Sequence, residues 1–500
     1  MPTNYTSMIQ NAITQYANDG VGLYKAIRNI HIQAKAAGDS IDYPGGSTLN
    51  ITVCLDDFGN AQEIPLSDNV NFRGCTFYVT NNTGKEFNLF SLKQNSDPNT
   101  VTLNKEQLRR NATVYGSNNE LDSTPKLIIV EDQAQWTTRT EYDENNVLVT
   151  TPFYRKDVLY VVGNIVQNNP ITTYNNSQSS PLCKYINVNT NQKSFRSIIF
   201  RRTEASNALT NLITIKNQYN VLLDSVITIT PEQYPDNGIY HDRCINIEDS
   251  AKIILNSVVF NHTYSAIYHW GYGISIYNVW DTSITNLTAC NPAKGVMGNE
   301  NVNELTVENS NLNRVDVHCY GRDITCINCT FQNTSNTFHI YNRVSSFYGS
   351  LTYNNCTFNN FLPLRIDSAY NAFTPFDLIF ENCTLNVASN HKSLVNTMTM
   401  VSTLNPRPEL QAKCLPKIII TNMHLNIPST VTDFCFIKLL NNDYTGSIHY
   451  MNIFIVYVSE YSHAGSVPVT IYDVNETVTL TEQLTRITNI SMICNLVSGF

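Results

Sequence analysis

The stretches DITCINCTF (323–331), LTYNNCTF (351–358) and LIFENCTL (378–385) repeat one pattern. In each stretch, alternating apolar residues lead to an Asn, a Cys and a second short apolar run. Alternation with a period of two is typical of a β-strand that buries one face. Asn is a common turn residue, so its position between the two runs indicates a corner. Each stretch is therefore predicted to form a strand, a corner and another strand.

This pattern recurs along most of the chain, with the corner Asn separated by between 19 and 40 residues. The corner residues are Asn256, Asn286, Asn309, Asn328, Asn355, Asn382, Asn422 and Asn452. A period of this size, built from strands with insertions of variable length, predicts a β-solenoid whose stacked coils bury their inward residues together. The alternative, a β-sandwich, would not need the same corner so many times.

The chain contains 13 cysteines, and several of them occupy the same place in the repeat. Cys75, Cys329, Cys356 and Cys383 each precede a Thr and an apolar residue. The CxxC formed by Cys326 and Cys329 has no matching second half, so no zinc site is predicted, nor any other metal or cofactor. We expect the thiols to be free, buried and stacked in the core, as in a protein that folds in a reducing compartment.

The composition excludes several classes of function. The 500 residues carry a formal net charge of −9, which argues against binding to nucleic acid. No apolar run is long enough to cross a membrane. The first residues lack a basic segment followed by an apolar one, so we expect no signal peptide.

One helical region is predicted, over residues 8–37. Its apolar residues recur every three or four positions, at Leu23, Ile27, Ile30, Ala34 and Ala37. Gly38 is a natural end for this helix, and DYPGG (42–46) then breaks the chain. These features predict three regions: a helical attachment or capping segment (1–45), first coils with loop insertions (46–200) and a main parallel β-helix (201–500).

Two stretches resemble a known superfamily. AIRNIHIQAKAAGDSIDYPGGSTLNITVCL (26–55) resembles the capping helix and first coil of pectate-lyase-like, right-handed parallel β-helix proteins. LTVENSNLNRVDVHCYGRDITCINCTF (305–331) resembles tail spike and appendage proteins of bacteriophages. The resemblance implies an all-β, right-handed parallel β-helix with a short N-terminal helical segment. It does not imply a particular enzymatic mechanism, because the sequence signatures of pectate lyases and polygalacturonases are absent.

The stretch NRVDVHCYGRD (313–323) contains the candidate catalytic residues. Arg314, Asp316 and His318 alternate with Val315 and Val317, so the three ionisable residues are expected to share an exposed outer face. On such a face Asp316 could act as a general base or nucleophile, and His318 as an acid or as an orienting group. Arg314 could hold the carboxylate of an acidic sugar.

Neighbouring coils are expected to add substrate-binding residues to the same outer face. An aromatic-rich segment just upstream adds flat rings that suit sugars. The predicted binding residues are Lys294, His339, Tyr341, Arg343, Arg365, Asp367, Trp270 and Tyr272. The alternative is a ladder of ion pairs that only supports the sheet or a subunit interface.

The resemblance implies a virion tail spike or appendage protein, made in the cytoplasm of the host cell. Its expected partners are other tail proteins and a host cell-surface polysaccharide, which it could also depolymerise as a hydrolase or lyase. By the same resemblance it is expected to be a homotrimer. Two alternatives remain open: a cellular carbohydrate-active enzyme of the same fold, and a purely structural tail component.

Overall fold

The computed structural model contains two compact units, which are described in turn below. Unit 1 consists of residues 1–99, 124–127 and 186–298, and unit 2 of residues 100–123, 128–185 and 299–500. The structure describes residues 3–85, 87–94, 99–114, 123–142, 148–171, 181–202, 210–229, 242–261, 272–290, 296–318, 321–332, 342–344, 347–359, 364–366, 376–387, 393–398, 413–414, 417–426, 434–440, 450–451, 456–458, 461–463 and 469–474.

Unit 1 begins with two helices, α1 (Tyr5–Gln15) and α2 (Gly20–Ala37). The side chains of Asn4 and Asp19 cap the two N-termini by accepting backbone N–H donors. Gly38 ends α2 in the left-handed conformation at φ 71°, as the sequence predicts. Helix α2 buries Leu23, Ile27, Ile30 and Ala34 of the predicted face, whereas Ala37 is exposed.

The strands of unit 1 pair in parallel with strands of the next coil, as in β4 with β11 and β11 with β13. The strands are β1 (Ile41–Asp42), β2 (Thr48–Thr52), β3 (Ile64–Pro65), β4 (Asn69–Thr80), β5 (Phe87–Lys93), β11 (Lys193–Arg202), β12 (Thr210–Lys216), β13 (Tyr219–Ile229), β14 (Asp242–Asn261), β15 (Ile274–Thr285) and β16 (Thr288–Cys290). Strand β17 (Met297–Glu308) begins at the end of unit 1 and continues into unit 2.

An aromatic cluster forms the core next to the helices of unit 1. Phe72, Phe77 and Phe90 meet edge to face, with ring centroids 5.3 to 5.8 Å apart. Tyr43 and Phe200 extend the cluster on either side. Such edge-to-face contacts add to the stabilisation from burial, so the first coils are well anchored.

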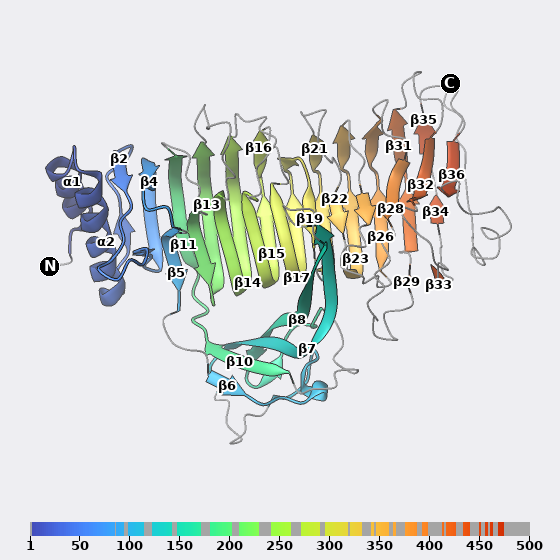
Figure 1. Ribbon diagram of the computed structural model, residues 1–500, viewed down its shortest axis with the longest axis horizontal. Helices are drawn as coiled ribbons and strands as arrows, with labels where there is room; N and C mark the ends of the chain where they lie inside the picture. The colour runs from blue at the N-terminus through green and yellow to red at the C-terminus, as the bar shows by residue number, and fades with distance from the viewer. Residues whose placement is uncertain are drawn as a thin grey trace. The chain divides into compact units, whose positions relative to one another are not determined.

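Unit 2 repeats a coil of three strands. Every third strand is paired in parallel, as β20 with β23 and β23 with β26 (Figure 1). The strands are β18 (Asn311–Leu312), β19 (Val315–Val317), β20 (Gly321–Ile327), β21 (Thr330–Gln332), β22 (Asn342–Val344), β23 (Phe347–Asn354), β24 (Thr357–Asn359), β25 (Leu364–Ile366), β26 (Asp377–Glu381), β27 (Thr384–Asn386), β28 (Ser393–Met398), β29 (Lys413–Cys414), β30 (Lys417–Thr421), β31 (Met423–Asn426), β32 (Phe434–Leu440), β33 (Tyr450–Met451), β34 (Val456–Val458), β35 (Tyr461–His463) and β36 (Val469–Val474). The predicted solenoid of stacked coils is confirmed.

The repeated Asn residues of unit 2 lie at the corners and stack coil on coil. Asn309, Asn328, Asn355, Asn382 and Asn422 all have φ between 51° and 53°, in the left-handed region. Asn tolerates this conformation better than most residues, which explains why it recurs. The Asn328 Nδ2 donates to Asn309 Oδ1 at 3.2 Å. The predicted corners are confirmed at these five positions.

The prediction of a corner at Asn256, in unit 1, is wrong by one residue. The left-handed residue there is Ser257, at φ 53°, and Asn256 is paired as strand with Asp224. The side chain of Asn256 nevertheless joins the ladder, because its amide donates to Asp224 and its oxygen accepts from Asn286. Asn452 lies outside the described residues.

Three thiols stack in the core of unit 2, as predicted. The Cys356 thiol forms hydrogen bonds with those of Cys329 and Cys383, and all three side chains are buried. These hydrogen bonds, together with burial, raise the pKa of Cys356 well above its ordinary value. Each cysteine that the structure describes in full is free.

Unit 2 also contains most of a five-stranded sheet inserted between two coil strands. Its strands are β6 (Asn99–Val101), β7 (Lys126–Tyr142), β8 (Leu148–Val162), β9 (Ile165–Val166) and β10 (Leu182–Asn187), with the short 3-10 helix η1 (Lys105–Gln107). The sheet has its own apolar core and a buried ion pair, in which Arg155 Nη2 lies 2.8 Å from Asp132 Oδ2. The Arg322 guanidinium of β20 joins it to the coils by donating to the Pro170 carbonyl at 2.9 Å.

Candidate functional site

The predicted catalytic residues lie in β19 (Asp316) and directly beside it (Arg314 and His318), and this segment is not an exposed surface. Asp316 is fully buried and Arg314 is only 9 % exposed, while His318 is half-buried. Arg314 Nη2 lies 2.9 Å from Asp316 Oδ2, so the two residues form the expected ion pair. The prediction that both residues are exposed is wrong, because the strand is covered on both faces. The catalytic role rested on that exposure, since a buried carboxylate cannot meet a polysaccharide in this conformation.

Two of the predicted binding residues are neighbours in the backbone register. Arg343 of β22 pairs with Arg365 of β25. Val317 pairs with Val344, so the row that contains Asp316 continues to Arg343 rather than to His339. The residues Lys294, His339, Tyr341, Asp367 and Trp270 lie outside the described residues.

Tyr272 lies just before β15 in unit 1 and is half-buried. Its ring packs so closely on Gly298 that a Cβ at that position would lie 2.3 Å from the ring. Tyr272 therefore contributes to packing at this point, and its predicted contact with a sugar stays a prediction.

Two polar rows that were not predicted from the sequence cross successive strands of unit 1. Ser91, Thr214, Asn246 and Ser275 stand in register on β5, β12, β14 and β15, and none is more than 5 % exposed. Two residues further along the same strands, Lys93, Lys216, Glu248 and Tyr277 form a second row, which is partly exposed. We call the second row, together with Glu63, Asn88, Asn211, Thr214 and Asn246, the polar edge of unit 1.

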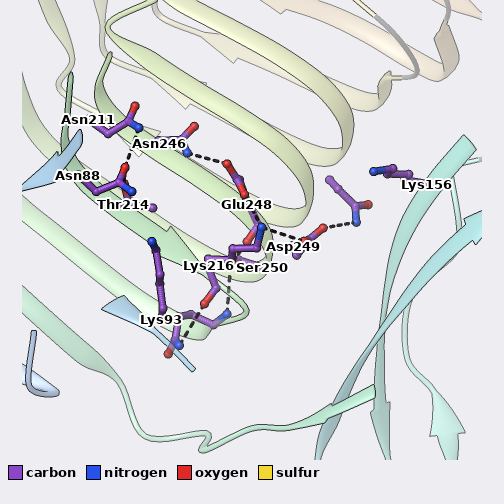
Figure 2. A network of polar contacts seen from close by, with 12 residues as sticks. Asn88, Lys93, Lys156, Asn211, Thr214, Lys216, Asn246, Glu248, Asp249 and Ser250 are labelled. Atoms are coloured by element: carbon purple, nitrogen blue, oxygen red, sulfur yellow. Dashed lines mark hydrogen bonds and ion pairs between the residues drawn. The ribbon is translucent and has the colours of Figure 1, made fainter. Parts of the chain in front are cut away.

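Hydrogen bonds link these residues from coil to coil (Figure 2). Lys216 Nζ donates to Glu248 Oε2 at 2.7 Å, and Asn246 Nδ2 donates to Glu248 Oε1 at 2.8 Å. Between β12 and β5, one coil earlier, Asn211 Nδ2 and the Thr214 hydroxyl both donate to Asn88 Oδ1, at 2.7 and 2.9 Å. The polar edge therefore contains two hydrogen-bonded groups of side chains, one joining β5 to β12 and the other joining β12 to β14.

Glu63, just before β3, extends the network to the first coil. Lys93 Nζ donates to both Glu63 carboxylate oxygens, at 2.6 and 2.8 Å, and Asn88 Nδ2 donates to Oε1 at 2.6 Å. Burial alone would raise the pKa of Glu63, but the hydrogen bonds from Lys93 and Asn88 outweigh it and hold the pKa below its ordinary value. The same balance, with Lys216 and Asn246 as donors, lowers the pKa of Glu248.

A polar depression of about 340 Å³ adjoins this end of the network. It lies where α2, the loop before β3, and β5 come together in unit 1. Its lining residues are Arg28, Lys35, Asp56, Ala61, Gln62, Glu63, Pro65, Ser91 and Lys93. The depression thus combines three cations, two carboxylates and neutral polar groups.

These residues gave only weak signals in the sequence. Lys93 ends β5, Lys216 ends β12, and Glu248 lies within β14. Insertions of very different length separate these strands, so no fixed spacing marks the three residues as a row. Arg28 and Lys35 lie seven residues apart on the predicted helix, which places them on one face, but a charged helix face is usually only solvated.

The described residues form neither a metal site nor a membrane-spanning helix. Among the described residues, no group of His, Cys, Asp and Glu side chains is arranged to hold a metal ion. Likewise, none of the described helices is long and apolar enough to span a membrane.

Comparison with known proteins relates the chain to others by fold and not by sequence. No family model matches it, and no curated protein matches it. The tailspike of Pseudomonas phage phi297 matches with a TM-score of 0.51 and 11% identity, over 97% of this chain and 80% of the tailspike. The chain is a right-handed parallel β-helix.

Two further solved structures are similar to this β-helix at lower scores. The tailspike of Acinetobacter baumannii bacteriophage AP22, solved with A. baumannii capsular saccharide, has a TM-score of 0.46 and 10% identity, over 97% of this chain and 78% of that one. PfbA, a surface adhesin of Streptococcus pneumoniae, has a TM-score of 0.33 and 10% identity, over 92% of this chain and 91% of the adhesin.

Proposed function

We propose that this β-helix is a virion tail spike or appendage protein that binds a host cell-surface polysaccharide. The likeness of its fold to the phi297 tailspike supports the first part of the proposal. The polar edge of unit 1 supports the second, and it is the observation on which the proposal depends. Amide and carboxylate groups repeated from coil to coil can accept and donate hydrogen bonds along an extended chain of sugars.

The polar edge is suited to binding rather than to cleavage. An inverting or retaining glycosidase needs a carboxylic acid whose pKa is raised, so that it can protonate the leaving oxygen. Glu63 and Glu248 have lowered pKa values instead, because Lys93 and Lys216 donate hydrogen bonds to them. Both carboxylates therefore stay ionised at neutral pH and act as hydrogen-bond acceptors.

The proposal includes assembly as a homotrimer and attachment to other tail proteins through the N-terminal segment. A cellular carbohydrate-active enzyme of the same fold remains the alternative, and cleavage of the polysaccharide would favour it.

A binding experiment with variants of the polar edge tests the proposal. Immobilised capsular polysaccharide of the host bacterium should retain the purified protein, and Lys216→Ala with Glu248→Gln should weaken the affinity about tenfold. This expectation assumes the loss of one or two hydrogen bonds, at about 1 kcal/mol each.

Arg201→Gln is the matched control, because Arg201 is an exposed cation of β11 that is outside the polar edge and lies over the Tyr78 ring. It should leave the affinity unchanged. If the wild-type protein fails to bind the polysaccharide while remaining folded, the proposed function is wrong and a structural role is favoured.

A further inference from the structure

The cations of the depression differ in how many of their hydrogen-bond donors already have a partner within the protein. Lys93 is committed to Glu63 through two short hydrogen bonds. Arg28 donates only its Nε, to the Glu63 backbone carbonyl at 3.0 Å, so its two terminal nitrogens have no partner among the described residues. Lys35 has a single long contact, 3.5 Å to the Lys93 carbonyl. Two cations therefore have spare donors.

The carboxylates of the depression are already satisfied. Asp56 Oδ1 accepts the backbone N–H groups of Phe58 and Asn60, at 2.9 and 2.8 Å. The hydrogen bond from the Asn60 backbone is the main reason why the pKa of Asp56 is lowered. Glu63 is neutralised by Lys93. The depression as a whole therefore presents positive charge, although the chain is acidic.

The two spare cations are held in fixed places by α2. Arg28 and Lys35 are seven residues apart, which is two helical turns and about 10 Å along the axis. Both side chains are half-buried, so they have lost part of their hydration and their freedom before any ligand arrives. Preorganised cations of this kind bind anions more strongly than exposed ones do.

The neutral groups around the two cations suit a sugar. Gln62 lines the depression with a side-chain amide that has no partner among the described residues, and Ser91 adds a hydroxyl. The same loop carries Phe58, which is 89 % exposed and held in place by the hydrogen bonds of Asp56. A carboxylate ligand that also carries hydroxyl groups and an apolar ring face would match all three features.

We propose that the depression is a subsite for an acidic sugar, in which Arg28 and Lys35 bind the carboxylates of a uronic-acid-containing glycan. This inference rests on the proposed function and names its substrate class and one of its contact points. The bidentate guanidinium of Arg28 suits a carboxylate, and Lys35 can reach a second acidic group further along the glycan.

Calorimetric titration with defined oligosaccharides tests the inference. The probes are a hexamer of galacturonate, a hexamer of hyaluronan and the carboxyl-reduced, neutral form of each. The acidic form of at least one pair should bind at least tenfold more tightly than its neutral form. The double variant Arg28→Gln, Lys35→Gln should remove that preference.

Lys25→Gln is the matched control, because Lys25 is an exposed cation of the same helix that does not line the depression. It should leave the preference intact. If acidic and neutral forms bind equally, or if the double variant keeps the preference while folded, the acidic subsite is ruled out. If the acidic subsite is ruled out but capsular polysaccharide still retains the wild-type protein, the proposed function is unaffected.

The pH dependence gives a second readout. Burial lowers the pKa of Lys35 from its ordinary value and outweighs the nearby carboxylates of Asp68 and Glu63, which act to raise it. This lysine therefore loses its charge at a lower pH than an exposed lysine does. Affinity for the acidic hexamer should therefore be full below that pKa and fall as the pH rises through it. Lys35→Arg should remove this fall, because arginine stays charged throughout. An unchanged alkaline profile in Lys35→Arg would count against the assignment.

Discussion

At the scale of single residues, the Arg314–Asp316 pair shows how burial changes the role of a charged residue. Both residues are removed from water and lie 2.9 Å apart. Taking one partner from a buried pair costs about 3–5 kcal/mol, whereas replacing both by apolar residues can be close to neutral. Asp316→Asn should therefore lower the free energy of unfolding by about 3 kcal/mol.

Denaturant unfolding of Asp316→Asn and of the double variant Arg314→Met, Asp316→Leu checks this prediction. The double variant should recover most of the lost stability. A stable Asp316→Asn protein that had lost the ability to cleave a polysaccharide would restore the catalytic role for this residue.

His31 is a second buried ionisable residue, in the α2 face that covers the first coil. It is fully buried, its Nε2 lies 2.7 Å from the Tyr43 hydroxyl, and burial lowers its pKa to about 3. Between pH 6.5 and that value, the unfolded chain binds a proton that the folded chain does not. The free energy of unfolding should therefore decrease as the pH is lowered through this window, by about 1.4 kcal/mol per pH unit.

His31→Gln tests this expectation, because Gln can keep the hydrogen bond to Tyr43 but does not titrate. Thermal unfolding from pH 7 to pH 4 should show a shallower loss of stability for the variant than for the wild type. Identical slopes would mean that other groups account for the sensitivity to acid.

At the scale of elements, the Asn corners determine where each strand ends. Asn355 is exposed and has φ 52°, so its side chain can be changed without opening the core. Asn355→Val should destabilise unit 2 by about 1–2 kcal/mol, because a β-branched residue is disfavoured in the left-handed region. Asn355→Gly, which adopts this conformation freely, should unfold close to the wild type. Equal losses for Val and Gly would show that the Asn side chain itself is required.

The thiol ladder of unit 2 makes a prediction about redox state. Cys329, Cys356 and Cys383 are buried and hydrogen-bonded to one another as thiols. A thiol reagent should react with most of the 13 cysteines only after denaturation without reductant. Finding nearly all of them oxidised under those conditions would contradict the ladder of free thiols.

At the scale of the whole molecule, the proposal of a tail spike predicts a trimer. Light scattering at micromolar concentration should give a mass near three times that of the 56.4 kDa chain. A wild-type protein that is only monomeric would remove the trimer from the proposal and favour the cellular enzyme.

The sequence by itself determined the repeat. Strand alternation, the Asn corners and the stacked cysteines are local consequences of side-chain periodicity and of allowed backbone angles. The sequence of each coil is therefore enough to predict them. Asn309 to Asn422 and the Cys329–Cys356–Cys383 ladder were predicted for that reason. The misplaced corner at Asn256 shows the precision of such an argument, since Ser257 tolerates the same angle there.

Only the tertiary structure decided which polar residues meet and which are covered. Alternation shows that Asp316 and the two neighbouring valines lie on opposite faces, but whether the outer face reaches water depends on distant segments. Arg322 and Pro170, in contact across 152 residues, illustrate how such segments return. The polar edge likewise joins Lys93 to Tyr277 through register set by insertions of unequal length. Burial and register arise only when the coils stack, so the sequence of one coil cannot predict them.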